Sequence, residues 1–187
     1  TVVTIQMVFA ASGKSAMRWW SPDDPVLYGA TATLEGDHLT QRFGMREFRF
    51  DTRTGLGYLN GEICRWRGAS ITLHRFFADS LCKGHPWDEQ WVRRFLVDIP
   101  KKMNWNAFRL CIGPVPQQWL DIADEAGILF QYEYPIWPSS LGGYLTRLWS
   151  EEDLEKQVTE FVRDNWNHPS VVLWDVSNEF GLTGVKW

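Results

Sequence analysis

The stretch "NAFRLCIGPVPQQWLDIADEAGILFQYE", residues 106–133, reads as a strand, a helix and a second strand in that order. Its two ends, "NAFRL" and "ILFQYE", are short apolar runs typical of buried strands. Between them, Pro116 is suited to open a helix and Gly127 to end it. A helix that joins two such strands indicates parallel strands with a right-handed crossover. This stretch therefore predicts an α/β fold.

The same alternation continues on both sides of this stretch. Upstream, a strand is expected to end near Leu73–His74, and Asp88 is placed to cap a helix whose apolar residues recur on one face. Downstream, Ser150 and Asp153 resemble a capping box. The last apolar run, "PSVVLWDVSNEF" at residues 169–180, predicts a strand buried on both faces. Four strands and three helices fit either a doubly wound sheet or about half of an eight-stranded barrel, which needs ~250 residues when complete.

The first 52 residues differ from the rest, because they predict short strands joined by polar turns. Residues 1–9 alternate apolar and polar side chains, and the runs "LYGATATL" and "HLTQRFGMREFRF" follow after turn-forming residues. This pattern indicates the end of an antiparallel β-sandwich. We therefore expect two domains: the C-terminal part of a sandwich at 1–52, and an α/β domain at 53–187.

Composition excludes several classes of partner. The formal net charge is −4, and no dense Lys/Arg run is present, so we expect no nucleic-acid partner. The uninterrupted apolar runs are too short for a membrane span. Three widely separated cysteines match no metal-finger or redox spacing, which indicates structural thiols. Twelve tryptophans in 187 residues favour a core rich in indole, and some of these rings could bind sugar faces.

Several motifs then occur in an order that resembles family 2 of the glycoside hydrolases, which includes β-galactosidases, β-glucuronidases and β-mannosidases. They are "WSPDDPVLY", "FGMREF", "YLNGE", "RGAS", "MNWNAFRL", "DIADEAGILFQYEYP" and "NHPSVVLWDVSNE". The resemblance implies part of an immunoglobulin-like β-sandwich, followed by about four strands of a partial TIM (β/α)8 barrel. It also implies that the sandwich and barrel are completed by the rest of the same polypeptide.

The resemblance assigns the chemistry first to the end of the fourth predicted strand. Glu179 would be the general acid/base of a retaining exo-β-glycosidase, and Asn178 would bind the sugar 2-hydroxyl. Catalytic groups of barrels lie at the C-terminal ends of strands, where Glu179 falls. The alternative is that Glu179 only caps the following helix. The family's nucleophile, a second glutamate at the end of the seventh strand, is expected beyond Trp187, so we expect residues 1–187 alone to be inactive.

Four further positions are candidates for substrate binding. Arg109 ends the second predicted strand, and it could bind substrate or form an ion pair with Glu133 or Asp175. His74 could contact the substrate or only cap a strand. Glu133, in "QYEYP", is expected to orient its neighbours. Trp137 is the candidate sugar platform.

Two alternatives stay open at this point. Glu179 with Glu133 or Asp175 could form an inverting pair within the chain, or the chain could be a non-catalytic carbohydrate-binding fragment. The stretch "EYPIWPSS" lacks the histidine with which some relatives hold magnesium, so we expect no metal and no cofactor. The expected partner is a β-linked oligosaccharide or glycoside. The sequence does not assign the sugar or the compartment, although the resemblance favours a periplasmic or secreted protein.

Overall fold

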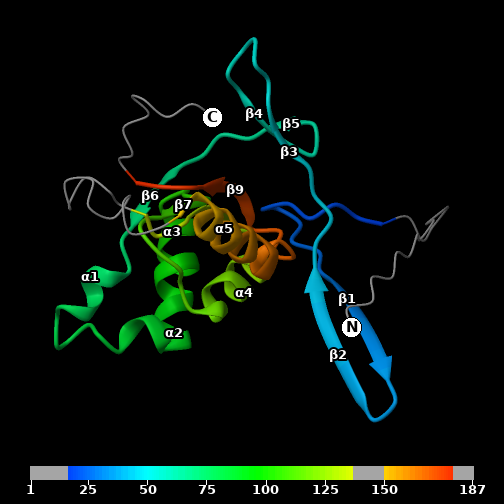
Figure 1. The fold of residues 1–187 in the computed structure, drawn as a ribbon. Coiled ribbons are helices and arrows are strands. Elements are labelled where there is room, and N and C mark those ends of the chain that lie inside the picture. The colour runs from blue at the N-terminus through cyan, green and yellow to red at the C-terminus, as the bar shows by residue number, and fades with distance from the viewer. Residues whose placement is uncertain (1–16, 137–149, 179–187) are drawn as a thin grey trace.

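The computed structural model describes residues 17–136 and 150–178, which form three sheets (Figure 1). A hairpin extends away from the helices, a small sheet connects it to the remainder, and a four-stranded sheet carries the helices. The antiparallel hairpin consists of β1 (Tyr28–Leu34) and β2 (Asp37–Phe43). The small antiparallel sheet consists of β3 (Phe48–Phe50), β4 (Gly57–Leu59) and β5 (Glu62–Ile63). The parallel sheet consists of β6 (Gly68–Ile71), β7 (Ala107–Leu110), β8 (Leu129–Glu133) and β9 (Val171–Asp175).

The helices follow the parallel strands, as the sequence predicts. The described helical segments are α1 (His74–Phe77), η2 (His85–Trp87), α2 (Glu89–Arg93), η3 (Arg94–Asp98), α3 (Ile99–Lys102), α4 (Gln117–Ala126) and α5 (Glu151–Asn165). The Asp88 carboxylate caps α2 by accepting from the backbone N–H groups of Gln90 and Trp91. The Ser150 hydroxyl caps α5 by accepting from the Asp153 N–H. Both predicted caps are therefore confirmed.

One predicted helix is not regular. The apolar spacing after Asp88 predicts an uninterrupted α-helix, but η3 is a π-helix in which the Ile99 N–H bonds to the Arg94 carbonyl. Pro100 explains the change, because it has no N–H for the carbonyl four residues earlier and its ring crowds that carbonyl. A wider turn before the proline lets the helix continue into α3.

The strand order distinguishes the two candidate architectures. The parallel sheet runs β6-β7-β8-β9, in chain order and without the reversal that a doubly wound sheet contains. The helices and strands share one apolar cluster, in which Phe108 and Leu110 of β7 meet Trp119 and Leu120 of α4. The helices thus cover one face of the sheet. Within the described residues, this is the arrangement expected of a partial barrel.

Strand β9 is less buried than the sequence predicts. Only Val171 is fully buried, while the other residues of the strand are half-buried and Val176 is exposed. The reason is topological, because β9 pairs with β8 on one side and has no second neighbour among the described strands. The pairing of β8 with β9 also contains a register shift between Phe130 and Gln131.

The predicted boundary between residues 52 and 53 falls within the small sheet, because β3 precedes it and β4 follows it. In the described part of the chain, no helix combines the length and apolarity that a membrane crossing requires.

Gly127 ends α4 in the left-handed conformation, with φ +71°, and a Cβ there would lie 2.3 Å from the carbonyl oxygen of Pro22. Gly127→Ala is expected to lower the free energy of unfolding by about 2–4 kcal/mol, from the left-handed penalty and the overlap together. Chemical denaturation of purified variants measures this change. Gly55→Ala is the matched control, since Gly55 has φ +69° and nothing within 4 Å of its Cβ position. Equal losses for the two variants would contradict the close approach of Pro22.

Candidate functional site

Three polar side chains meet where neighbouring parallel strands end. Arg109 lies near the end of β7, Glu133 ends β8, and Asn178 follows β9. One nitrogen of the Arg109 guanidinium, Nη2, donates to Glu133 Oε2 and to Asn178 Oδ1, the latter at 2.9 Å. The structure therefore brings together three of the six predicted site residues. Asn178 is also the residue that precedes Glu179 in the sequence.

Glu133 is completely buried, and both of its oxygens are bound. Oε2 accepts from Arg109, and Oε1 accepts from the backbone N–H of Ile112 at 2.9 Å. Burial raises the pKa of the Glu133 carboxyl, while the Ile112 N–H and the Arg109 charge act in the opposite direction. This carboxylate is suited to hold Arg109, since it is fully buried and each of its oxygens accepts from a donor within the protein.

Two more residues complete this group: Asp175, which the sequence offered as an ion-pair partner of Arg109, and Gln131, which it did not single out. Asp175 Oδ2 lies 3.3 Å from Arg109 Nε, an ionic contact without the geometry of a hydrogen bond. Gln131 Nε2 donates to the same Asp175 oxygen at 2.8 Å. Gln131 stands two residues before Glu133 on β8, so strand alternation places both on one face. This two-residue spacing from Glu133 is the feature of the sequence that could have identified Gln131 as a member of the group.

The remaining predicted residues do not join the group. His74 was expected to end the first strand, but β6 ends at Ile71 and His74 begins α1 as an exposed residue. The last ladder bond of β6 runs from the Cys111 N–H to the Ile71 carbonyl. The next carbonyl, that of Thr72, accepts instead from the Arg75 N–H, which begins a helical turn and ends the strand. No hydrogen bond of the His74 side chain occurs within residues 17–136 and 150–178. Glu179 and Trp137 lie outside the described residues.

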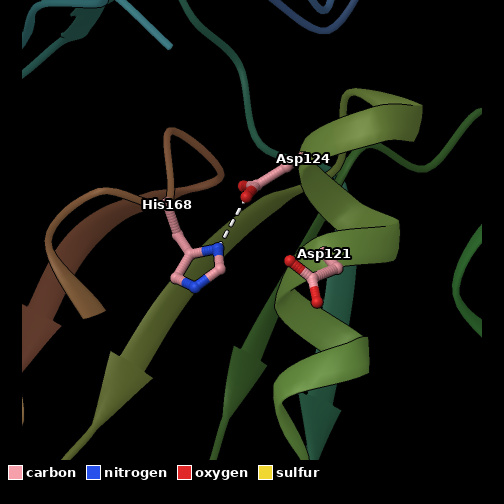
Figure 2. A group of neighbouring side chains, drawn as sticks. All are labelled: Asp121, Asp124 and His168. Atoms are coloured by element: carbon pink, nitrogen blue, oxygen red, sulfur yellow. Dashed lines mark hydrogen bonds and ion pairs between the residues drawn. The ribbon is translucent and has the colours of Figure 1, made fainter. Parts of the chain in front are cut away.

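A second polar group lies at the opposite edge of the sheet, where strands begin. His168 precedes β9, and its Nδ1 lies 2.6 Å from Asp124 Oδ2 (Figure 2). The ligand atoms of Asp121, Asp124 and His168 lie within 4.8 Å of one another, a separation that a metal ion could bridge. However, each is already bound within the protein. His168 Nε2 contacts the Gln117 amide, Asp124 Oδ1 accepts from the Ser170 N–H, and Asp121 pairs with Arg42. We interpret the group as structural.

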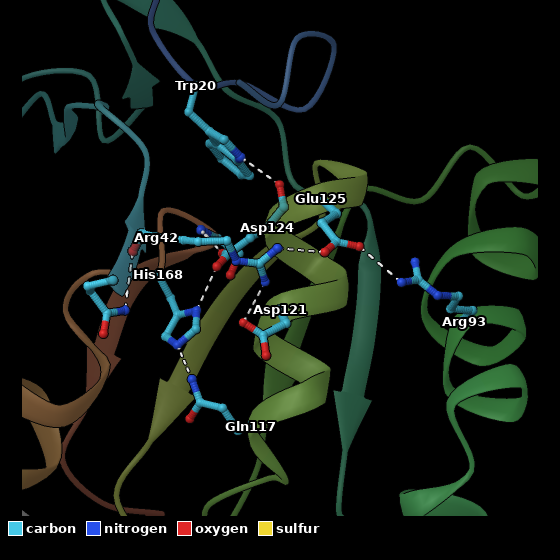
Figure 3. Close-up of polar contacts among 10 residues, drawn as sticks. Trp20, Arg42, Arg93, Gln117, Asp121, Asp124, Glu125 and His168 are labelled. Atoms are coloured by element: carbon cyan, nitrogen blue, oxygen red, sulfur yellow. Dashed lines mark hydrogen bonds and ion pairs between the residues drawn. The ribbon is translucent and has the colours of Figure 1, made fainter. Parts of the chain in front are cut away.

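This group also fastens the segment before the barrel to the barrel itself (Figure 3). The Trp20 indole N–H donates to the Asp124 carbonyl at 2.8 Å, and Arg42 pairs with both Asp121 and Glu125. Arg46 donates to the carbonyl oxygens of Pro169 and Val171. Through Arg46, the motif "FGMREF" is therefore attached to the N-terminal end of β9.

Comparisons with known proteins agree with a partial barrel. Residues 78–185 match the family described as glycosyl hydrolases family 2, TIM barrel domain. A putative β-glucuronidase of Formosa agariphila is 32% identical over 177 residues, covering 86% of this chain and 15% of that protein. The β-galactosidase BoGH2A of Bacteroides ovatus is 28% identical over 166 residues, covering 86% of this chain and 19% of that protein.

Solved structures show the same similarity. The crystal structure of a β-galacturonidase from Eisenbergiella tayi bound to galacturonate superposes with a TM-score of 0.68 at 25% identity. The match covers 87% of this chain and 28% of that one. The chain thus spans less than a third of the proteins to which it is compared here.

Proposed function

Since the chain belongs to family 2 of the glycosyl hydrolases, through that family's TIM-barrel domain, we propose that its full-length form is a retaining exo-β-glycosidase. Glu179 is the general acid/base, and a glutamate beyond Trp187 is the nucleophile. The observation that carries the proposal is the convergence of Arg109, Glu133 and Asn178 at adjacent strand ends, because Asn178 directly precedes Glu179 in the sequence. The proposal includes an immunoglobulin-like sandwich that residues 1–52 help to form.

The proposed roles follow from these contacts. Glu179 protonates the departing oxygen and then activates water, while the nucleophile attacks the anomeric carbon. Asn178 binds the sugar 2-hydroxyl, and Glu133 holds Arg109 beside it. His74 and Trp137 are proposed as outer substrate contacts. The substrate class is a β-linked glycoside, which agrees with the β-glucuronidase and β-galactosidase named among the relatives.

The test is an assay of the full-length protein with 4-nitrophenyl β-glycosides of galactose, glucose, mannose and glucuronate. We expect hydrolysis of at least one substrate, with the β-anomer of the sugar as the first product by NMR. An α-anomer as first product would contradict the retaining mechanism. Sugar binding with no turnover of any substrate would instead favour a carbohydrate-binding protein.

Glu133→Gln separates the retaining mechanism from an inverting pair within this chain. Since Arg109 lies between Glu133 and Asp175 and contacts both, we expect Glu133 to support the site without transferring a proton. The variant should lose about 10–150-fold in kcat, corresponding to the 1.5–3 kcal/mol of a charged hydrogen bond. Steady-state kinetics measures this loss. A complete loss of turnover would favour Glu133 as a catalytic acid or base.

A further inference from the structure

We propose that Asp175 and its partner Gln131 are positioning residues, which hold Arg109 so that Arg109 fixes the orientation of the Asn178 side-chain amide. The consequence is that Asn178 presents its N–H donors, and not its carbonyl oxygen, to the sugar. This inference rests on the proposed function, because it deepens the role of Asn178 in substrate binding.

The chemistry of arginine determines which end of the amide faces Arg109. A guanidinium has N–H donors and no acceptor, so the Asn178 atom at 2.9 Å from Arg109 Nη2 must be the carbonyl oxygen. The oxygen and nitrogen of a side-chain amide are assigned from their hydrogen-bond partners, and a partner that only donates, such as Arg109, permits one assignment. The Nδ2 group of Asn178 is consequently turned away from Arg109.

A second donor supports the same orientation. Cys111 Sγ lies 3.8 Å from Asn178 Oδ1. Burial and the neighbouring Glu133 carboxylate raise the pKa of the Cys111 thiol, so it keeps its proton and can donate weakly to that oxygen. The Asn178 backbone is fixed as well, because its N–H donates to the Ile136 carbonyl at 2.8 Å.

Arg109 is itself held from two sides that differ in rigidity. On one side, Glu133 is completely buried and is bound by the Ile112 N–H. Ile112 has φ +56°, which for a β-branched residue is strained by roughly 1–2 kcal/mol. Such strain persists where surrounding contacts impose it, and here the strained residue directs its N–H to a buried carboxylate.

On the other side, the Asp175 side chain is 22% exposed and contacts Arg109 through Nε. Gln131 limits the freedom of Asp175 with a 2.8 Å hydrogen bond. Removing the Asp175 charge would leave Glu133 as the only carboxylate partner of Arg109 among the described residues, and the guanidinium could then rotate about that anchor. Asn178 Oδ1 would then lose its fixed donor, and the side-chain amide could rotate by half a turn.

The test compares a good β-glycoside substrate of the full-length enzyme with its 2-deoxy analogue. Because the analogue lacks the hydroxyl that Asn178 binds, amide orientation cannot affect its rate. Asp175→Asn should lower kcat/KM about 10-fold on the parent substrate and less than about 3-fold on the analogue. It should add no loss in an Asn178→Ala background, because coupled residues are not additive. Gln131→Met should show the same pattern more weakly, and it replaces Asp175→Asn if that variant does not fold.

Asp164→Asn is the control, since Asp164 is an exposed residue of α5 and should alter neither rate. Equal losses on the two substrates would overturn the inference, because a general structural role does not depend on the 2-hydroxyl. Loss on both substrates from Asn178→Ala would also overturn it. A wild-type enzyme that hydrolyses neither substrate would instead refute the proposed function, and the inference with it.

Discussion

Glu179→Gln should lower kcat of the full-length enzyme on an alkyl β-glycoside by about 10²–10⁴-fold, the usual contribution of general acid–base catalysis. Glutamine has nearly the same shape as glutamate, but it cannot give a proton to the departing oxygen or take one from water. Alkoxide is a poor leaving group, so the unprotonated bond breaks slowly. Steady-state kinetics on the variant and wild type measures the loss.

The leaving group supplies the internal control for this prediction. A 2,4-dinitrophenyl glycoside needs no protonation, so formation of the glycosyl-enzyme should be nearly unchanged in Glu179→Gln. Azide should then restore turnover, because this anion attacks the intermediate without a general base. Glu160→Gln, at an exposed position of α5, should have no effect. An equal loss on alkyl and dinitrophenyl substrates would show that Glu179 is not the acid.

Asp124→Ala should lower the free energy of unfolding by about 3–5 kcal/mol, the usual effect of breaking a buried pair. Asp124 is 3% exposed, and its carboxylate accepts from the Ser170 N–H at 3.0 Å and contacts His168 Nδ1 at 2.6 Å. Truncation would leave both partners buried and unsatisfied. Denaturant unfolding of the full-length protein, followed by tryptophan fluorescence, measures the change.

Asp121→Ala is the matched control, one turn earlier on the same helix. Asp121 pairs with Arg42, and the two side chains are 39% and 43% exposed. Exposed pairs contribute about 0–1 kcal/mol, so this loss should be small. Similar losses for Asp121→Ala and Asp124→Ala would contradict a stabilising role for the buried pair.

The parts of the fold that were predictable depend on local chemistry. Asp88, Ser150 and Gly127 act on backbone groups within three or four residues, so the sequence identifies the helix ends that they form. The end of β6 was not predictable, because it depends on where pairing with β7 stops. The contact between Asp124 and His168 spans 44 residues, and no local pattern indicates it.

The candidate site likewise has one part that could be predicted from the sequence and one part that could not. Arg109, Glu133 and Asn178 could be predicted to converge, since the ends of adjacent parallel strands meet at one edge. The alternative that the sequence left open for Arg109, ion pairs with Glu133 or Asp175, is observed for both carboxylates. The hydrogen bond from Gln131 to Asp175 could not be anticipated, because it depends on how β8 and β9 are aligned.

That alignment depends on the register shift in β9. Phe130 pairs with Val171 and Gln131 pairs with Leu173, so Val172 has no partner on β8. If Val172 instead paired with Gln131 in a regular ladder, Glu133 would pair with Trp174, and Asp175 would face the helices. The register shift, and not any single side chain, thus decides whether a carboxylate or an indole faces Arg109. Insertions or deletions that change this register are therefore expected to lower activity more than most substitutions in the strand.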